Sequence, residues 1–496
     1  MEKVLFVYID YDELNPYVGG GTISHGIAAL AGALRDNGIQ YSLLQIMSPL
    51  SESGYREVLS KYGNYNIIAL SFTTVRKEVY YKVAKYIKSF SSDKYVVAGG
   101  IHPTVASEDA ISNEHVDCIC IGEGEEILPA IVKNYRTRNL NSVPNIYFKQ
   151  ENGEIIRNDF IFNIKNNLDL YPRPDYSIYN FNNMHCYNAR VRQLPIMISR
   201  GCPFNCAYCS NYAINKVTKQ VAIKIYSPQK AIDLIKENLK LKDFHSILFD
   251  DDVLGIKRDW SKEFFSLYKR EIDMPFKCYT RPEFLDEELA SMMKEAGCYR
   301  LAFGLETGVE SIRFNILNKR VRNSDFIRCF NLCRKYGIDI ITNNMIGMPS
   351  ETITDSLETI KFNARNGVDV TMRAICTPYR FTKLYDDCKT NNLFKEAGSA
   401  DMGDPYGKIV LKFKNYSDLQ IKFILSAWNL LFVIYRRLYK LNKGFLIKMV
   451  DQLVILSKPT YPLFIFLRHK FFLGKLTTRL FRELERGKEW TVKQQG

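Results

Sequence analysis

The chain contains 496 residues, of which 46% are hydrophobic and 25% are charged, and its formal net charge is +14. This length favours two or three domains, and the composition is that of a globular protein rather than a disordered or fibrous one. The longest apolar runs are far shorter than the roughly 20 residues that span a bilayer, so we expect a cytoplasmic protein whose 12 cysteines stay reduced.

Short apolar strands alternate with helical patterns over residues 1–150, and the first of them is predicted to be a β-strand rather than a signal peptide. The predicted strands cover residues 4–9, 41–45, 67–71, 95–98 and 118–121, and the predicted helices cover residues 25–37, 78–90 and 125–135. This alternation predicts an α/β domain with a doubly wound parallel sheet of the Rossmann or flavodoxin type.

Glycine and polar residues collect where the strands of this domain end, which is where ligands of such sheets bind. They are Ser71, Thr73, Gly99, Gly100, His102, Pro103, Thr104, Gly122, Glu123 and Gly124. A glycine at a strand end lets the backbone approach a flat ligand closely, although a tight turn is the alternative for each one.

The stretches LSFT, GGIHPT and GEGE that contain these residues resemble the cobalamin-binding domain that precedes many radical S-adenosylmethionine (SAM) domains. The resemblance implies that the ten residues above bind cobalamin. The DxHxxG loop that supplies a histidine to cobalt in some cobalamin domains is absent, so we expect no histidine on cobalt. His25 and His102 are candidates by position only, and a structural role is the alternative for both.

Residues 151–190 are predicted to be a linker, because Pro172 and Pro174 hold the chain extended.

Residues 201–211 read GCPFNCAYCSN, which places Cys202, Cys206 and Cys209 at CxxxCxxC spacing with Tyr208 before the third. Thiolates hold iron–sulfur clusters, and three of them leave one iron of a four-iron cluster open to a small molecule. A structural zinc loop and three core cysteines are the alternatives. The spacing resembles the signature of radical SAM enzymes, which implies a 4Fe-4S cluster that binds SAM and cleaves it to a 5′-deoxyadenosyl radical.

Six strand–helix units are predicted over residues 191–400. The strands cover residues 196–199, 246–249, 276–279, 301–303, 339–343 and 370–374, and the helices cover residues 228–241, 261–272, 286–296, 324–336, 355–366 and 383–391. A full eight-unit barrel usually takes about 250 residues. Six units fit the partial, TIM-like (β/α)6 barrel that the radical SAM resemblance implies.

Polar residues also follow strands of this barrel. Asp251 and Asp252 follow the second strand, for which a solvated loop is the alternative, and Arg281 follows the third, with a guanidinium suited to holding a carboxylate. Glu306 ends the fourth. The resemblance implies that Asp251, Asp252 and Glu306 bind SAM, with Glu306 as the leading contact. Arg281 and Tyr208 are further candidates for binding the cofactor.

Residues 401–496 are predicted to be a basic helical segment, since residues 405–496 alone carry 18 Lys and Arg against 5 Asp and Glu. A capping box at Ser417 and Gln420 predicts a helix to about residue 441, followed by helices over residues 445–456 and 464–484. The segment is either a helical cap with a solvated basic face or a basic amphipathic surface for peripheral contact with an anionic membrane. No nucleic-acid-reading motif is present, so we expect no nucleic-acid partner.

The resemblance over residues 1–400 implies a cobalamin-dependent radical SAM enzyme. The leading hypothesis is a methyltransferase that acts on an unactivated carbon of a small-molecule or lipid-like substrate, with methylcobalamin as the methyl donor. Rearrangement, cyclisation or oxidation with the same cofactors is the alternative, and a non-catalytic cobalamin and iron–sulfur binding protein is the second alternative. An external electron donor such as flavodoxin or ferredoxin is implied as a partner.

Overall fold

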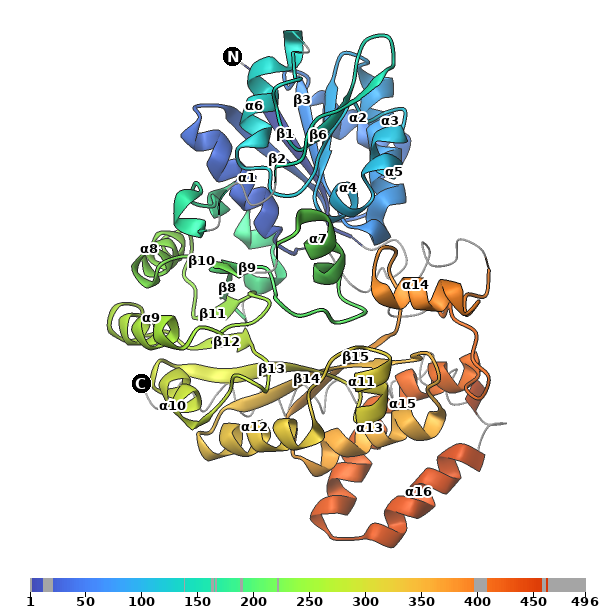
Figure 1. Cartoon of the computed structure of the whole chain (residues 1–496). Coiled ribbons are helices and arrows are strands. Elements are labelled where there is room, and N and C mark those ends of the chain that lie inside the picture. The colour runs from blue at the N-terminus through green and yellow to red at the C-terminus, as the bar shows by residue number, and fades with distance from the viewer. Residues whose placement is uncertain are drawn as a thin grey trace.

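The structure is a computed structural model in which a sheet built by the N-terminal part of the chain stands above a second sheet built by the middle part (Figure 1). It describes residues 2–11, 21–137, 139–161, 165, 167–187, 191–220, 223–396, 408–456 and 461–462.

The N-terminal sheet has seven strands in the order β2-β1-β3-β4-β5-β6-β7. The first five pair in parallel, as predicted, whereas β6 and β7 join the edge as an antiparallel hairpin. The strands are β1 (Lys3–Ile9), β2 (Gln40–Ile46), β3 (Ile67–Ser71), β4 (Tyr95–Gly99), β5 (Cys118–Cys120), β6 (Ile146–Lys149) and β7 (Ile155–Arg157). The sheet therefore extends into the segment that we predicted to be linker, because Gly153 makes the turn that folds β7 back onto β6.

Helices cover both faces of this sheet, as expected for a doubly wound domain (Figure 1). They are α1 (His25–Asp36), α2 (Glu52–Ser60), α3 (Lys77–Phe90), α4 (Ile101–Val105), α5 (Ser107–Ser112) and α6 (Ile127–Asn134). The predicted helices correspond to α1, α3 and α6, while α2, α4 and α5 were not predicted.

The second sheet has six parallel strands in the order β15-β14-β13-β12-β11-β8, and its two edge strands do not pair with each other. It is thus the open, partial barrel that was expected. The strands are β8 (Gln193–Ile196), β11 (Ser246–Phe249), β12 (Phe276–Tyr279), β13 (Cys298–Glu306), β14 (Asp339–Ile346) and β15 (Val370–Ile375).

The predicted first barrel strand, residues 196–199, is wrong in position. β8 ends at Ile196, and Ser199 already belongs to β9 (Ser199–Arg200), which pairs antiparallel with β10 (Lys224–Ile225). The backbone amides of Ile198 and Ser199 donate to the Asp251 carboxylate at 3.1 and 2.5 Å, which turns them out of the parallel ladder.

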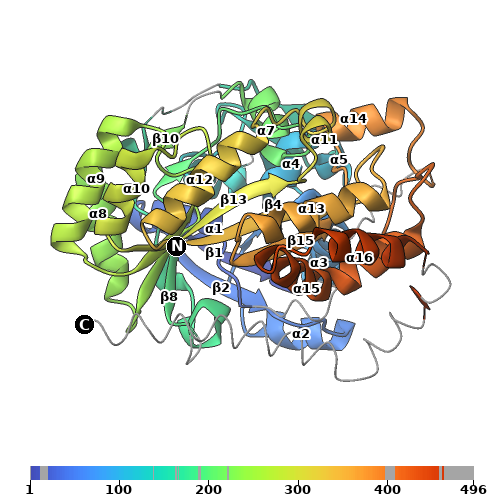
Figure 2. The same ribbon diagram turned by 90° about the horizontal axis from the view of Figure 1, so that it is seen from below.

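Helices α12, α13 and α15 cover the outer face of β13, β14 and β15 (Figures 1 and 2). The helices of this half are α7 (Ser210–Thr218), α8 (Pro228–Leu239), α9 (Arg258–Glu271), α10 (Glu287–Glu295), α11 (Glu310–Asn315), α12 (Asn323–Lys335), α13 (Ile353–Arg365), α14 (Lys383–Thr390), α15 (Asp418–Lys440) and α16 (Gly444–Leu456). The short helices α7 and α11 were not predicted.

Helix α15 begins at the predicted capping box, in which Ser417 and Gln420 satisfy each other's backbone amides. Among the described residues it alone has the length and apolar composition of a membrane span, and half of that stretch is buried. The buried Trp428 donates from its indole nitrogen to Thr371 of β15 at 2.9 Å, so α15 packs as a helix of the barrel wall. The helix predicted over residues 464–484 lies outside the described residues.

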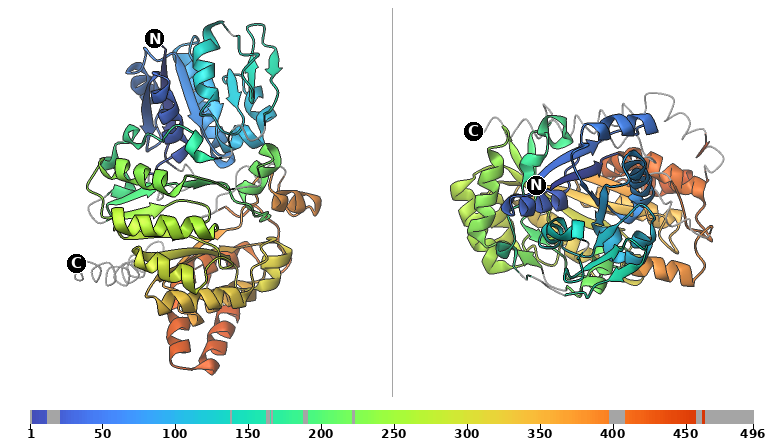
Figure 3. Two further views of the ribbon diagram at one scale, coloured as in Figure 1. Left: turned by 60° about the vertical axis from the view of Figure 1, so that its left-hand side comes forward. Right: turned by 90° about the horizontal axis from the view of Figure 1, so that it is seen from above.

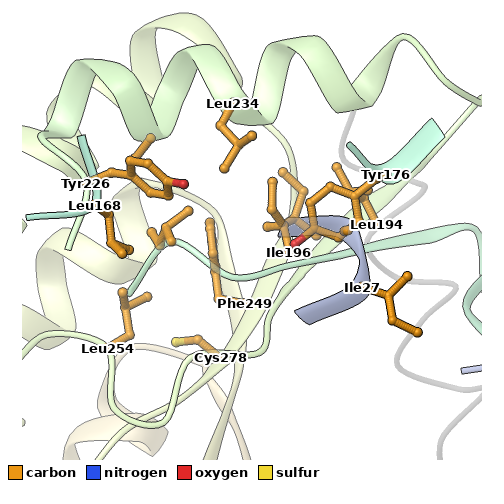
Figure 4. Close-up of a cluster of buried hydrophobic side chains, with 14 of the residues drawn as sticks. Ile27, Leu168, Tyr176, Leu194, Ile196, Tyr226, Leu234, Phe249, Leu254 and Cys278 are labelled. Carbon is orange, nitrogen blue, oxygen red and sulfur yellow. The ribbon is translucent and has the colours of Figure 1, made fainter. Parts of the chain in front are cut away.

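One hydrophobic core joins the two sheets. Figure 4 shows Tyr176 of the connecting segment beside Ile196 of β8, with Ile27 of α1 on one side of this pair and Phe249 of β11 on the other. All four side chains are buried in the same cluster. The connecting segment is not simply extended, because it forms four short 3₁₀ turns, at Leu168–Leu170, Tyr176–Ile178, Phe181–Asn183 and His185–Tyr187. It packs between the two sheets and so sets their relative position.

Candidate functional site

The cysteine loop occupies the turn between β9 and α7, at the carboxyl end of the first barrel strands. The backbone of Ala207 fixes it, since its amide donates to Leu317 at 2.8 Å and its carbonyl accepts from Leu384 at 2.8 Å. Cys206 is buried and Cys202 and Cys209 are partly exposed. The turn after α11 and the first turn of α14 therefore hold the cysteine loop at the mouth of the barrel.

The three thiols are free, and no disulfide engages any of the chain's cysteines. Burial raises the pKa of the Cys209 thiol to about 12, so binding iron must displace its proton. No three His, Cys, Asp or Glu side chains of the described residues converge as ligands of a single ion do. In an iron–sulfur cluster each thiolate binds a different iron, so the three cysteines need not point at one common position.

Arg281 lies against this loop. Its Nη1 is 3.5 Å from Cys206 Sγ, and its guanidinium lies 3.5 Å from the ring centre of Phe204. The other side of the guanidinium pairs with Glu283 at 2.6 Å. Arg281 thus places a positive charge next to a cluster cysteine. Its guanidinium was predicted to bind a SAM carboxylate, but Glu283 already occupies some of its hydrogen-bond donors.

Two predicted SAM residues meet directly. The Tyr208 hydroxyl donates to Glu306 Oε1 at 2.7 Å, and Lys319, which was not predicted, forms an ion pair with the same oxygen at 3.0 Å. All three side chains are buried or nearly so, and Gly304 makes room for them, because a Cβ there would lie 2.4 Å from Glu306 Oε1. These contacts fix the position of the Glu306 carboxylate beside the cysteine loop.

The aspartates after β11 face different ways, because successive residues of an extended chain alternate. Asp251 is buried under the β8–β9 turn, where its carboxylate accepts from Ile198 and Ser199, and burial raises its pKa to about 7. Asp252 is exposed, hydrogen-bonds Asn211 and lies near the cysteine loop. Of the predicted pair, only Asp252 is placed to meet a ligand.

A cavity of about 370 Å³ lies between the two sheets, at the carboxyl ends of β3, β4 and β5. A second cavity of about 260 Å³ shares Gly100, Glu123 and Arg200 with it. The first is closed from the barrel side by Met197, Arg200, Ile214 and Tyr226, so both halves of the chain build one space.

Seven of the ten residues predicted for cobalamin line these cavities. They are Ser71, Gly99, Gly100, Thr104, Gly122, Glu123 and Gly124.

The other three, Thr73, His102 and Pro103, do not line either cavity. His102 is buried, with its Nε2 2.9 Å from Asp109 and its ring stacked on Phe72, so its role is to anchor α4. His25 does line the larger cavity, where its two ring nitrogens contact the Tyr176 hydroxyl and Asp250.

A charged network that the sequence analysis missed crosses between the two halves. Arg200 Nη1 lies 2.5 Å from Glu125, and Lys224 Nζ lies 2.5 Å from Glu123, which also accepts from the Tyr171 hydroxyl. Glu125 and Lys224 are buried. Because Arg200 comes two residues before Cys202, this network ties the glycine-rich end of β5 to the start of the cysteine loop.

Comparison with known protein families assigns these two halves separately. Residues 17–132 match the B12 binding domain, and residues 196–362 match the radical SAM superfamily. The chain belongs to the cobalamin-dependent radical SAM enzymes. Its cofactors are therefore a 4Fe-4S cluster, SAM and cobalamin, which fit the three-thiol loop and the cavity at the glycine-rich strand ends.

Three similarities support this assignment. The enzyme is 27% identical to an uncharacterized methyltransferase of Pyrococcus horikoshii over 419 residues. This match covers 81% of the present chain and 85% of the relative. It is 24% identical over 397 residues, 78% of this chain and 70% of the relative, to the anaerobic magnesium-protoporphyrin IX monomethyl ester cyclase of Rubrivivax gelatinosus. Its fold matches that of the cobalamin-dependent SAM radical enzyme OxsB, with a TM-score of 0.70 at 14% identity over 100% of this chain and 81% of that one.

Proposed function

We propose that the enzyme transfers a methyl group to an unactivated carbon of a small-molecule or lipid-like substrate. The observation that supports this best is the shared cavity, since Arg200 lines it and begins the loop that carries Cys202. Bound cobalamin supplies a methyl group, and the cluster with SAM supplies a radical that removes hydrogen. Methyl transfer to an unactivated carbon needs both functions to face one space.

The chain's own residues also prepare a SAM site beside the cysteine loop. Tyr208 and Lys319 hold the Glu306 carboxylate, which we propose accepts hydrogen bonds from the ammonium group of SAM. Asp252 lies on the same side as a second acceptor. Arg281 stabilises the negative charge that the cysteine sulfurs carry when they bind iron.

The inner wall of the barrel favours a substrate with an apolar part. Strand alternation turns one set of side chains inward, because their neighbours pack against the outer helices. Toward the carboxyl ends of the strands, the inward set includes Leu248, Tyr279, Asn343, Met345 and Met372, none of which is charged. The charged members of this set, Lys277 and Asp339, lie nearer the amino ends of their strands.

Cyclisation, rearrangement or oxidation with the same cofactors is the second candidate, because the relatives include a cyclase. Methyltransferase is nevertheless the function that the compared relatives name most often. Radical SAM enzymes also need a reductant, and we propose that flavodoxin or ferredoxin provides the electron.

Product stoichiometry separates the two candidates. The reconstituted enzyme is incubated under reduction with extract of the producing cells and SAM whose methyl group carries deuterium. A methyltransferase forms S-adenosylhomocysteine and 5′-deoxyadenosine in about equal amounts above the background without extract, and puts deuterium into a product. Formation of 5′-deoxyadenosine alone, with no labelled product, contradicts methyl transfer and supports the second candidate. Cys206→Ala is the control that loses both products.

A further inference from the structure

The turn between α15 and α16 exposes apolar side chains at the end of the molecule farthest from the N-terminal sheet. Figure 3 (left) shows these two helices, in orange-red, projecting from the lower end of the molecule. At the turn, Leu441, Phe445 and Leu446 are exposed, and Phe445 keeps 76% of its surface accessible. Large aromatic side chains are seldom left in water at the tip of a projecting hairpin without a binding partner.

The apolar surface continues along α16. Met449, Leu453 and Leu456 are exposed and follow Phe445 at intervals of four, four and three residues, which places them on one face of the helix. The opposite face is the one that packs, because Ile447 and Val454 are buried in the core shared with α15. We refer to Leu441, Phe445, Leu446, Met449, Leu453 and Leu456 as the apolar stripe.

Basic residues surround this stripe. Arg437, Lys440, Lys443 and Lys448 are all exposed. The acidic residue of α16, Asp451, points inward, where Lys361 and Tyr435 hold its carboxylate at 2.7 and 2.6 Å. The outer surface of the hairpin therefore carries net positive charge around an apolar centre.

We propose that the apolar stripe and its four basic residues dock the enzyme on an anionic phospholipid bilayer. The apolar side chains enter the boundary between headgroups and acyl chains, while the lysines stay at the headgroups and attract anionic lipid. Such a contact places the enzyme at a membrane without any spanning helix. This proposal does not depend on which reaction the enzyme performs.

Two other occupants of the stripe are disfavoured by charge. A second copy of the chain would bring its own lysines against these lysines, and like charges facing one another oppose association. Tyr461 of the same chain packs on Phe423 and Val454, on the buried side of the hairpin. Residues 463–496 carry 8 Lys and Arg against 3 Glu, so their net positive charge opposes their binding to the basic surface of the stripe. An anionic lipid surface complements the stripe in both charge and polarity.

Vesicle sedimentation of the reconstituted full-length enzyme tests the proposal. We expect it to sediment with vesicles that mix phosphatidylcholine and phosphatidylglycerol equally, and to stay in solution with phosphatidylcholine alone. High ionic strength should release it. Phe445→Gln with Leu446→Gln should abolish sedimentation although the charge is unchanged. Each of Lys443→Gln and Lys448→Gln should lower the partition coefficient about fivefold.

The controls are chosen to separate the stripe from general effects. Lys82→Gln with Lys85→Gln removes two exposed charges from α3 and should leave sedimentation unchanged. Cluster absorbance and SAM cleavage in solution should be the same in every variant, which shows that the fold and the proposed function do not depend on docking.

Three results would overturn the proposal. The first is equal sedimentation of the Phe445 and Leu446 double variant and the wild type. The second is loss of sedimentation on deleting residues 463–496 while the double variant still binds. The third is a concentration-dependent dimer that the double variant abolishes, with no sedimentation of the wild type, since a second copy would then cover the stripe.

Discussion

At the scale of single residues, Glu306 combines strain with buried charge. It is not glycine, yet its φ is 65°, a left-handed conformation that costs a side-chain-bearing residue about 1–2 kcal/mol. Its carboxylate is buried and paired with Lys319. A strained residue that keeps a buried charge is typical of ligand-binding positions, where the surrounding fold maintains both.

Replacing Lys319 tests this pairing. Lys319→Met leaves the Glu306 carboxylate buried without its counter-charge, which should lower the free energy of unfolding by about 3–5 kcal/mol. The double variant Lys319→Met/Glu306→Gln removes both charges and should recover most of that loss. Urea unfolding of the three proteins measures it, and equal stabilities of the single and double variants would contradict the coupling.

Glu351 should give the enzyme a measurable dependence of stability on pH. Burial raises its pKa to about 7, although Ser356 and the Met348 amide donate to its carboxylate at 2.7 and 2.9 Å. Since the folded state holds this proton more tightly than the unfolded state, the stabilisation is complete below about pH 4.5 and is lost as the pH rises through about 7. Relative to Glu351→Gln, the wild type should therefore lose unfolding free energy between pH 5 and pH 8, roughly the interval between the two pKa values. A constant difference between them across denaturant titrations would show that this group does not titrate.

At the scale of elements, the end of β4 has two adjacent glycines with different roles. Gly100 has a φ of 92°, and a Cβ there would lie 2.8 Å from the Phe72 amide nitrogen. Gly99 lines the larger cavity, and its Cβ would meet Cys120 at an ordinary 3.8 Å. Gly100 is thus required by the backbone, whereas Gly99 keeps the cavity open.

Substitution of Gly99 should therefore reduce cobalamin binding, whereas substitution of Gly100 should reduce stability. Gly99→Leu should fold with near-normal stability but retain several-fold less cobalamin after gel filtration, whereas Gly100→Ala should lower the melting temperature. Gly153→Ala is the matched control for Gly100, because its φ is 84° and its Cβ would meet nothing within 4 Å, so it adds only the strain of about 1–2 kcal/mol. If Gly99→Leu binds cobalamin normally, the cavity is not the cofactor site.

Arg200 joins two elements from different halves of the chain. Arg200→Gln leaves the buried Glu125 without its counter-charge and should lower the unfolding free energy by about 3–5 kcal/mol, with a parallel loss of bound cobalamin. Arg192→Gln is the control, because its partner Asp243 is mostly exposed and such pairs contribute about 0–1 kcal/mol. Thermal unfolding and the corrin spectrum measure both effects. Equal effects of the two substitutions would show that Arg200 does not join the halves.

At the scale of the whole molecule, the shared core predicts that the two sheets unfold together. Ile27 and Tyr176 belong to the same buried cluster as Ile196 and Phe249 (Figure 4). His25 also contacts Asp250 across the boundary between the two halves. Calorimetry of the full-length enzyme should show one main transition, with cobalamin released at the same temperature. Two separated transitions, with cobalamin lost only in one, would mean that the halves are independent domains.

Much of the fold follows from local patterns. Five strands and one cap lie where the sequence predicts them, namely β1, β3 and β4 of the N-terminal sheet, β11 and β12 of the barrel and the capping box of α15. Short apolar runs predict the strands, and Ser417 with Gln420 predicts the cap, because both signals depend only on near neighbours in the chain. The cysteine spacing likewise identifies the cluster loop without any tertiary information.

The two domain types, the three cofactors and the cluster loop were predicted from short motifs that resemble those of a known family, and each motif needs only residues close together in the chain. Which side chains meet could not be predicted in this way and is seen in the folded chain. The fold pairs Arg200 with Glu125 across 75 positions, gives Glu306 the counter-charge of Lys319, turns Asp251 away from the site and buries His102. These contacts depend on how strands and helices pack, and a buried charge gains its partner only when packing brings the two together.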